Sequence, residues 1–94
     1  MRQNEVLKAT GIEMWKSRVV LNDGESLWHD RASSEGFMQE TDIDIYSIVQ
    51  PDGTVTGSVR VTDHTAVKEF KRTVRVIQND AHGRVVVDES FRSG

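Results

Sequence analysis

Three short turns rich in Asp and Gly, each flanked by apolar and mostly β-branched residues, constrain the fold of this chain most. They lie at residues 22–24, 51–53 and 79–83. Glycine tolerates the positive φ that tight hairpin turns require, so such a turn between two strand-forming runs is a strong local signal of a β-hairpin. Three hairpins predict about six antiparallel strands.

The spacing of apolar residues predicts where the strands lie. The middle hairpin is the clearest, because Val55, Val59 and Val61 alternate with polar residues after its turn. Gly57 interrupts this apolar face, which predicts a β-bulge or the close approach of another backbone. The strands are expected at residues 12–21, 25–29, 42–50, 54–62, 70–79 and 84–90.

The segments between these strands carry weaker signals. Residues 29–41 are predicted to be the longest irregular stretch, and residues 65–69 allow at most one helical turn. Both faces of the strand expected at residues 12–21 carry apolar side chains, which predicts partial cover on both sides. In the strand at residues 42–50, Ile43 and Ile45 are expected to face the core, whereas the aspartates between them face solvent.

We expect residues 1–94 to form a single all-β domain. A chain of this length buries roughly 60 to 68% of its unfolded surface without metals or disulfides. Six antiparallel strands in hairpins predict a small barrel or a β-sandwich, and the sequence does not separate the two. Residues 1–5 and 91–94 are expected to fray unless Phe91 docks on the core. A sandwich would expose edge strands, through which a homodimer could form.

The composition excludes several classes of function. Without cysteine the chain has no disulfide framework, no thiolate nucleophile and no Cys-ligated metal. Its net charge of −3 argues against binding of nucleic acid by the whole surface, because attraction to phosphate requires positive charge. We expect no cofactor, no signal peptide and no membrane span, and the cytoplasm is the default location, although a chain trimmed of its export signal would look the same.

The sequence gives little support for a catalytic or metal-binding role of the polar residues. His29 and His64 each adjoin an aspartate in the sequence, but neighbours on a strand point to opposite faces, so neither pair is automatically a dyad. Ser33 or Ser34 could complete a hydrolytic site on paper, yet no glycine-framed serine is present. The alternating acids Glu40, Asp42 and Asp44 could bind calcium, but solubilising acids at the start of a strand are the commoner explanation. We therefore predict neither catalytic residues nor a metal site.

The irregular stretch supplies the leading functional prediction, a non-enzymatic protein-binding module or accessory subunit. Phe37 and Met38 offer adaptable apolar contact, Arg31 offers an anchor and Trp28 opens the stretch. Protein interfaces are enriched in these residue types. The alternative explanation is that Trp28 and Phe37 serve the core.

A basic tract supplies the alternative function, binding of nucleic acid or another polyanion. Lys71 and Arg75 share a strand face, and Arg60 joins them if its strand pairs with theirs. No aromatic side chain is interleaved for base stacking, which argues against single-stranded nucleic acid as the ligand. A His/Asp-dependent hydrolase is the third and least supported possibility.

Overall fold

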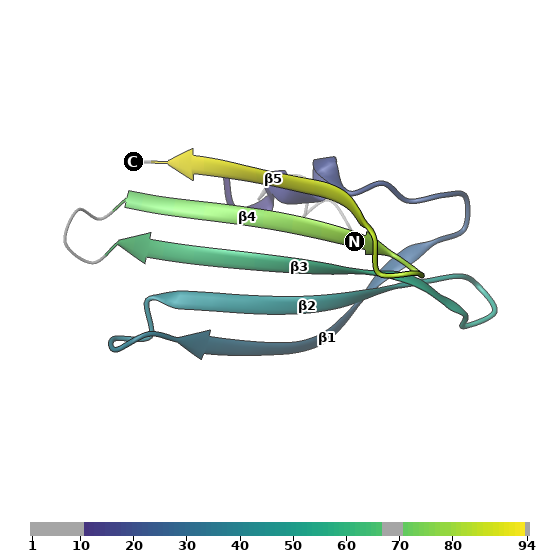
Figure 1. The fold of residues 1–94 in the computed structure, drawn as a ribbon, viewed down its shortest axis with the longest axis horizontal. Coiled ribbons are helices and arrows are strands. Elements are labelled where there is room, and N and C mark those ends of the chain that lie inside the picture. The colour runs from purple at the N-terminus through teal and green to yellow at the C-terminus, as the bar shows by residue number, and fades with distance from the viewer. Residues whose placement is uncertain (1–10, 67–70, 94) are drawn as a thin grey trace, which may run out of the picture.

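A computed structural model describes residues 11–66 and 71–93 and shows one antiparallel sheet (Figure 1). Each strand pairs with the next one along the chain. The elements are the 3₁₀ helix η1 (Gly11–Arg18) and the strands β1 (Ser26–Glu35), β2 (Thr41–Val49), β3 (Val55–Ala66), β4 (Lys71–Asp80) and β5 (Val85–Ser93). The predicted all-β antiparallel class is confirmed. Five strands form instead of about six, and in the described part of the chain they make neither a closed barrel nor two stacked sheets.

The helix η1 occupies most of the segment that was expected to be the first strand. It packs on β4 and β5, and in Figure 1 it lies behind them. Its Trp15 is buried, and the Trp15 ring centroid lies 5.1 Å from that of Tyr46 on β2. A single sheet must bury one face against another element, and this need outweighs the strand propensity of the segment. We call the side that η1 covers the packed face.

Valines and an isoleucine from the three central strands make the core beneath Trp15. The buried cluster consists of Trp15, Ile48, Val59, Val61, Val74 and Val76. Partly buried side chains from β1 and β5, Leu27 and Val87 among them, extend the cluster to both edges of the sheet. The core therefore has one layer of strand side chains under one short helix.

A two-point hydrogen bond attaches the segment after η1 to the sheet. The Val20 N–H donates to Gln78 Oε1 at 2.8 Å, and Gln78 Nε2 donates to the Val20 carbonyl at 2.9 Å. Gln78 is a buried polar residue of the packed face, with 5% of its surface exposed. Its amide satisfies both backbone groups of Val20 as a neighbouring strand would, so the chain is held beside β4 without a further strand.

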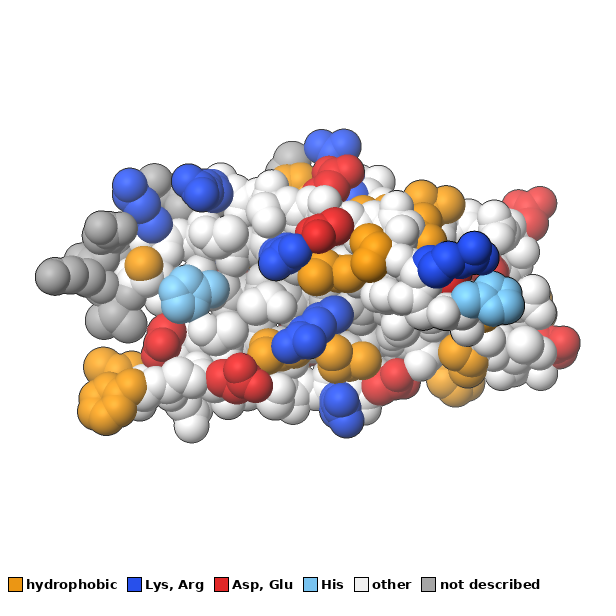
Figure 2. Space-filling view, viewed as in Figure 1, with side chains coloured by type: hydrophobic (Ala, Val, Ile, Leu, Met, Phe, Trp, Pro, Cys, Tyr) orange, Lys and Arg blue, Asp and Glu red, His pale blue; other side chains and the backbone are white. Residues whose placement is uncertain are grey.

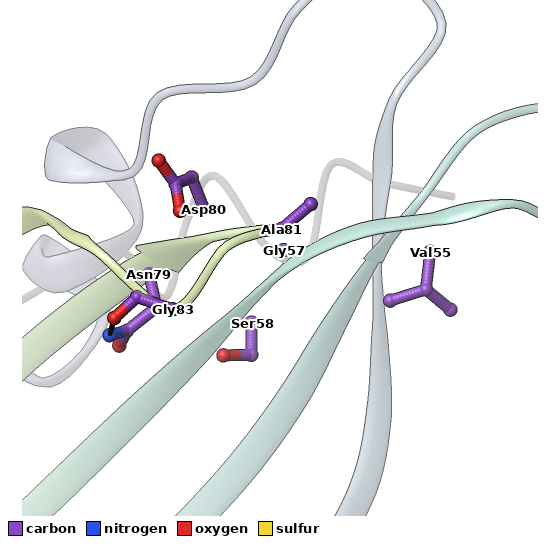
Figure 3. Close-up of a pocket in the computed structure, with 7 residues that line it drawn as sticks. All are labelled: Val55, Gly57, Ser58, Asn79, Asp80, Ala81 and Gly83. Atoms are coloured by element: carbon purple, nitrogen blue, oxygen red, sulfur yellow. Dashed lines mark hydrogen bonds between the residues drawn. The ribbon is translucent and has the colours of Figure 1, made fainter.

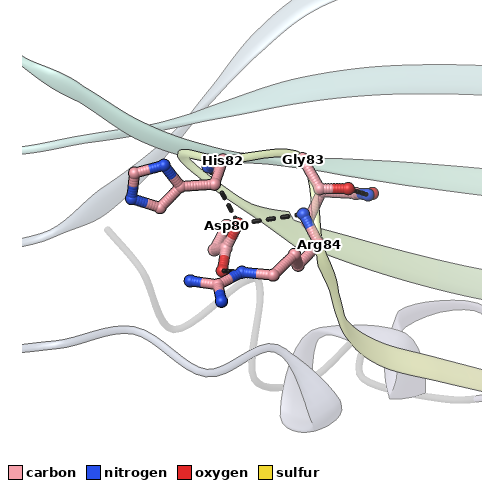
Figure 4. Close-up of polar contacts among 5 residues, drawn as sticks. Asp80, His82, Gly83 and Arg84 are labelled. Atoms are coloured by element: carbon pink, nitrogen blue, oxygen red, sulfur yellow. Dashed lines mark hydrogen bonds and ion pairs between the residues drawn. The ribbon is translucent and has the colours of Figure 1, made fainter.

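Local hydrogen bonds to aspartate build the last predicted turn (Figure 4). Asp80 Oδ1 accepts from the backbone N–H groups of His82 and Arg84 at 2.8 and 2.9 Å, and Gly83 has a φ of +82°. These bonds, that of the Arg84 amide first, lower the pKa of Asp80. Asp52 caps the β2–β3 turn in the same way by accepting from the Thr54 N–H at 2.9 Å. Both turns join neighbouring strands, as predicted.

The first predicted turn forms but does not close a hairpin. Gly24 takes a φ of +83°, and the turn joins η1 to β1 instead of joining two strands. The hairpin next to it is β1–β2, whose turn spans residues 36–40. β1 therefore continues to Glu35 through most of the stretch expected to be irregular. Nearly all of its side chains are exposed, so the strand shows little of the apolar alternation that identifies a strand in sequence.

Gly57 lies at the predicted bulge. The pairing of β2 with β3 shifts register between Ile48 and Val49, and a Cβ added at Gly57 would lie 2.6 Å from the Asn79 carbonyl oxygen. Both the bulge and the close backbone approach are thus confirmed. The bulge also moves Val55 out of phase with Val59, so Val55 is 57% exposed although it was expected to share the core face.

The two remaining predictions concern segments at the limits of the described residues. β3 continues to Ala66, so a helical turn does not begin at Thr65, while residues 67–70 lie outside the described part. Residues 91–93 were expected to fray, but β5 continues to Ser93 and Phe91 packs against the core cluster. Residues 1–5 lie outside the described residues, as does residue 94.

Candidate binding surface

The face of the sheet opposite η1 carries alternating charged and apolar side chains. We call it the open face, and Figure 2 shows it with orange side chains between blue and red ones over the middle of the sheet. Strand register sets the rows, because directly paired residues point to the same side. The central row, from β1 to β5, is Arg31, Ile45, Arg60, Ile77 and Asp88.

The orientation of β2 reverses one prediction. Tyr46 and Ile48 pack on the core, and alternation places Asp44 on the same packed face. Ile43 and Ile45 therefore belong to the open face and not to the core cluster under η1, although Ile43 is itself buried, with 6% of its surface exposed, and Ile45 is half-buried. Both sides of β2 carry apolar residues, so the sequence of β2 does not determine which side is covered. Trp15 of η1 packs against Tyr46, and the isoleucines therefore lie on the opposite, open face.

Charge is distributed unevenly between the two faces of the sheet. Among the described strand residues, the open face carries the cations Arg31, Arg60, Lys71, Arg75 and Arg92 and the carboxylates Asp30, Glu35 and Asp88. Among the same strand residues, the packed face carries one cation, Arg72, and the carboxylates Asp42, Asp44, Asp63, Asp80 and Glu89. The overall negative charge of the chain thus conceals a strand face with more cations than carboxylates.

The cations of the open face differ in whether they have a partner. Arg75 donates to both carboxylate oxygens of Asp88, at 2.9 and 2.8 Å, and this guanidinium lowers the pKa of Asp88. Arg31, Arg60 and Lys71 have no hydrogen-bond or ion-pair partner among the described residues. Arg60 lies between two isoleucines in its row, so register places no carboxylate directly beside it.

The four residues predicted to contact a partner do not form one cluster. Trp28 and Arg31 lie on the open face of β1, and Trp28 is 62% exposed. Phe37 and Met38 lie in the β1–β2 turn, 99% and 64% exposed. At about 3.3 Å per residue, the length of β1 separates Trp28 from this turn by roughly 25 Å. Neither Trp28 nor Phe37 serves the core, so the alternative explanation for these aromatics is wrong.

All three residues of the predicted basic tract lie on the open face. Lys71 pairs with Ala66, Arg75 with Thr62 and Ile77 with Arg60, which puts the three cations on one side of β3 and β4. Arg75 is already paired with Asp88, however, and Lys71 lies at the end of β4. The three cations therefore do not form a continuous line of unpaired positive charge.

The histidines make cross-strand contacts instead of contacts with their sequence neighbours. His29 Nε2 lies 2.8 Å from Asp44 Oδ1, and His64 Nδ1 lies 2.7 Å from Thr41 Oγ1. Their neighbours Asp30 and Asp63 bind Ser47 and Arg72. Sequence adjacency therefore does not identify the partners of these histidines, and the His–Asp contact that does form joins His29 to Asp44 on the neighbouring strand.

The acids considered for calcium are engaged with other groups. Asp42 accepts from Ser34 Oγ at 2.8 Å, Asp44 contacts His29, and Glu40 accepts from the Met38 N–H in the turn. Within residues 11–66 and 71–93, no group of three or more His, Cys, Asp or Glu side chains could hold a metal ion. Ser34 is thus occupied by a carboxylate, which is not the contact a hydrolytic serine needs.

A hollow beside the β4–β5 turn is lined by small and polar residues (Figure 3). Its lining includes Ser58, Asn79 and Asp80. Asp80 and Ser58 point to opposite sides of the strands, and Asn79 Nδ2 donates to the Gly83 carbonyl at 3.0 Å. The polar groups here mostly serve the turn, so this hollow offers no set of free donors.

Comparisons with family models, with curated proteins and with solved structures find no match for this chain. No helix among the described residues is long and apolar enough to cross a membrane. The residues that sequence reasoning missed are the hydroxyl groups and isoleucines around Arg60. The period-two alternation of β3 and β4 contained them, but only the pairing of these strands with β2 and β5 shows which of them share a face.

Proposed function

We propose that this chain is a small non-enzymatic protein-binding module, an accessory subunit that docks an acidic surface of a partner protein on its open face. The observation that supports this best is the central row, where Ile45 and Ile77 flank Arg60 on the side opposite η1. Apolar area gives a partner something to bury, and unpaired cations favour carboxylates across the interface.

Two further groups extend this surface along β1. Arg31 continues the central row to the edge of the sheet, and Phe37 and Met38 project from the turn beyond it. Arginine, methionine and aromatic residues are enriched at interfaces because they combine apolar contact with directional hydrogen bonds. We infer that the row and the turn contact the same partner, with Trp28 at the far end of the surface.

Affinity capture with matched variants tests this proposal. The tagged chain is compared with Phe37→Ala/Met38→Ala and with Arg31→Gln/Arg60→Gln, in nuclease-treated and untreated lysate, and captured proteins are identified and then rebound in purified form. We expect an acidic protein that both double variants lose, with binding that weakens as salt rises because the contacts are charged.

Arg84→Gln is the control for loss of a positive charge away from the open face, because it removes one arginine at the β4–β5 turn, where Arg84 pairs with Asp80 at 3.2 Å. Equal capture by all variants would contradict the proposed surface. Nucleic acid recovered only without nuclease would favour the alternative polyanion function of Arg60, Lys71 and Arg75, whose affinity should fall steeply with salt.

Self-association and location complete the proposal. β1 and β5 are edge strands, and an edge with unpaired backbone groups can add a strand from a second copy. We propose a homodimer through such an edge, and a monomeric mass by sedimentation at high protein concentration would exclude it. We also propose a cytoplasmic location, which fractionation of cells that express the tagged chain tests.

A further inference from the structure

The open face contains a hollow lined by several hydrogen-bond donors. It has a volume of about 620 Å³ and is lined by Arg60, Thr62, His64, Thr73, Arg75, Ile77 and Ser90. Three adjacent strands contribute: Thr62 pairs with Arg75, which in turn pairs with Ser90. Side chains so paired lie roughly 5 Å apart, so donors from β3, β4 and β5 converge on one small area.

Apart from Arg75, which is paired with Asp88, most donors in this hollow have no partner among the described residues. The hydroxyl groups of Thr62, Thr73 and Ser90 have no hydrogen-bond partner among the described residues, and neither has the Arg60 guanidinium. His64 uses Nδ1 for its contact with Thr41. When the Thr41 hydroxyl donates to Nδ1, Nε2 of the neutral imidazole carries the proton and is a further donor.

From this arrangement we propose that the hollow binds a single oxyanion, a phosphate monoester, with Arg60 as the main charged ligand. Hydroxyl groups and a guanidinium are the donors that phosphate recognition uses, because charge-assisted hydrogen bonds to phosphate are short and strong. Several donors from different directions suit a tetrahedral group with three terminal oxygens better than a planar carboxylate. The inference goes beyond the proposed docking of a protein, since a small molecule could present the same group.

The ion pair of Arg75 and Asp88 favours one anion over a long polyanion. It removes Arg75 as a free cation, and Asp88 adds a carboxylate beside Ile77 in the adjoining row. Nucleic acid follows a continuous line of positive charge, and this pair interrupts the line that Arg60, Arg75 and Lys71 would make. Asp88 also opposes any anion in the hollow, so its removal should strengthen binding.

Titration with inorganic phosphate, followed by the backbone amide resonances of the ¹⁵N-labelled chain at low salt, tests the site. We expect saturable shifts at Thr62, Thr73 and Ser90. Arg60→Gln should weaken binding about tenfold, because a charge-assisted bond is lost. Asp88→Asn should tighten binding several-fold, since it releases Arg75 and removes a negative charge. Effects of opposite sign are not expected from a general loss of structure, which urea unfolding of each variant checks.

Arg84→Gln serves as the charge control and should bind phosphate like the wild type. A phosphoserine peptide and its unphosphorylated form distinguish the source of the group: tighter binding of the phosphopeptide than of phosphate supports a partner side chain, and equal binding supports a small molecule. Absence of saturable shifts, or equal binding by wild type and Arg60→Gln, would overturn the site. Tighter binding of an oligonucleotide, with shifts spreading to Lys71, would overturn it in favour of a polyanion groove. None of these results depends on the capture experiment with the Phe37 and Met38 variant.

Discussion

Replacement of Gln78 by methionine should remove the attachment of the segment after η1 while keeping the volume of the side chain. Two hydrogen bonds to Val20 are lost, each with a net value of about 0.5–1.5 kcal/mol, so the free energy of unfolding should fall by roughly 1–3 kcal/mol. With a urea m-value of about 1.5 kcal/mol/M, the midpoint of urea unfolding should fall by about 0.7 to 2 M. Tryptophan fluorescence reports this transition, because Trp15 is buried whereas Trp28 is largely exposed in the native state.

Amide hydrogen exchange locates the effect. The Val20 N–H should exchange slowly in the wild type and much faster in the methionine variant, although the Val20 side chain is 55% exposed. Gln50→Met is the control, because Gln50 is an exposed residue next to the β2–β3 turn, and surface changes of this kind usually stay within about 0.5 kcal/mol. An unchanged midpoint together with unchanged exchange at Val20 would refute the role assigned to Gln78.

A second substitution, Gln78→Glu, keeps the hydrogen-bond acceptor of the side chain and removes its donor. In Gln78→Glu the carboxylate still accepts from the Val20 N–H, but it faces the Val20 carbonyl without a proton to donate. Burial and this carbonyl should raise the folded-state pKa of the introduced carboxyl above its unfolded value of about 4.3. The loss of stability is then present above the folded pKa and disappears as pH falls below the unfolded one. A loss independent of pH would contradict this account.

Three further changes test other parts of the fold. Gly57→Ala should lower the free energy of unfolding by about 1–3 kcal/mol, measured in urea, because its Cβ would lie 2.6 Å from the backbone oxygen of Asn79; a neutral effect would contradict the close approach. Arg72→Met should lower the free energy of unfolding by about 1–2 kcal/mol, because it leaves the half-buried Asp63 without its cation and opposite the carboxylate of Asp42 on β2. In a double-mutant cycle, adding Asp63→Asn to the same chain should recover part of this loss. Stability should decline as pH falls below the ordinary Asp pKa of 3.8, because backbone donors, that of Arg84 first, lower the folded-state pKa of Asp80; Asp80→Asn should flatten this decline in pH-dependent urea unfolding.

Local chemistry explains the parts of the fold that the sequence predicts well. The β2–β3 and β4–β5 turns form where Asp and Gly predict them, because the carboxylates of Asp52 and Asp80 bond to amides of their own turns. Gly57 is similar in kind, since a missing side chain in an alternating strand marks a position where another backbone comes close. Each of these inferences uses residues within one hairpin.

The predictions that were wrong depend instead on contacts between segments that are far apart in the sequence. The segment containing Trp15 has strand-forming residues, yet it is helical because the Trp15 indole covers buried side chains that the sheet supplies from residues 48–76. β1 extends to Glu35 because β2 supplies the hydrogen bonds, although few β1 side chains are buried. Phe91 adds three residues to the end of β5 by packing on the same core.

The features of the candidate site also fall into those that the sequence indicated and those that only strand pairing determined. The sequence alone indicated which residue types could bind a partner, Phe37, Met38 and the cations Arg31 and Arg60 among them. Only strand pairing decided that Arg60 lies between two isoleucines, that Arg75 is held by Asp88, and that free hydroxyl groups from three strands surround one hollow. Turns and alternation depend on neighbours in the chain and can be read from it, whereas the side of the sheet that is covered depends on contacts such as that between Val20 and Gln78, which are 58 residues apart.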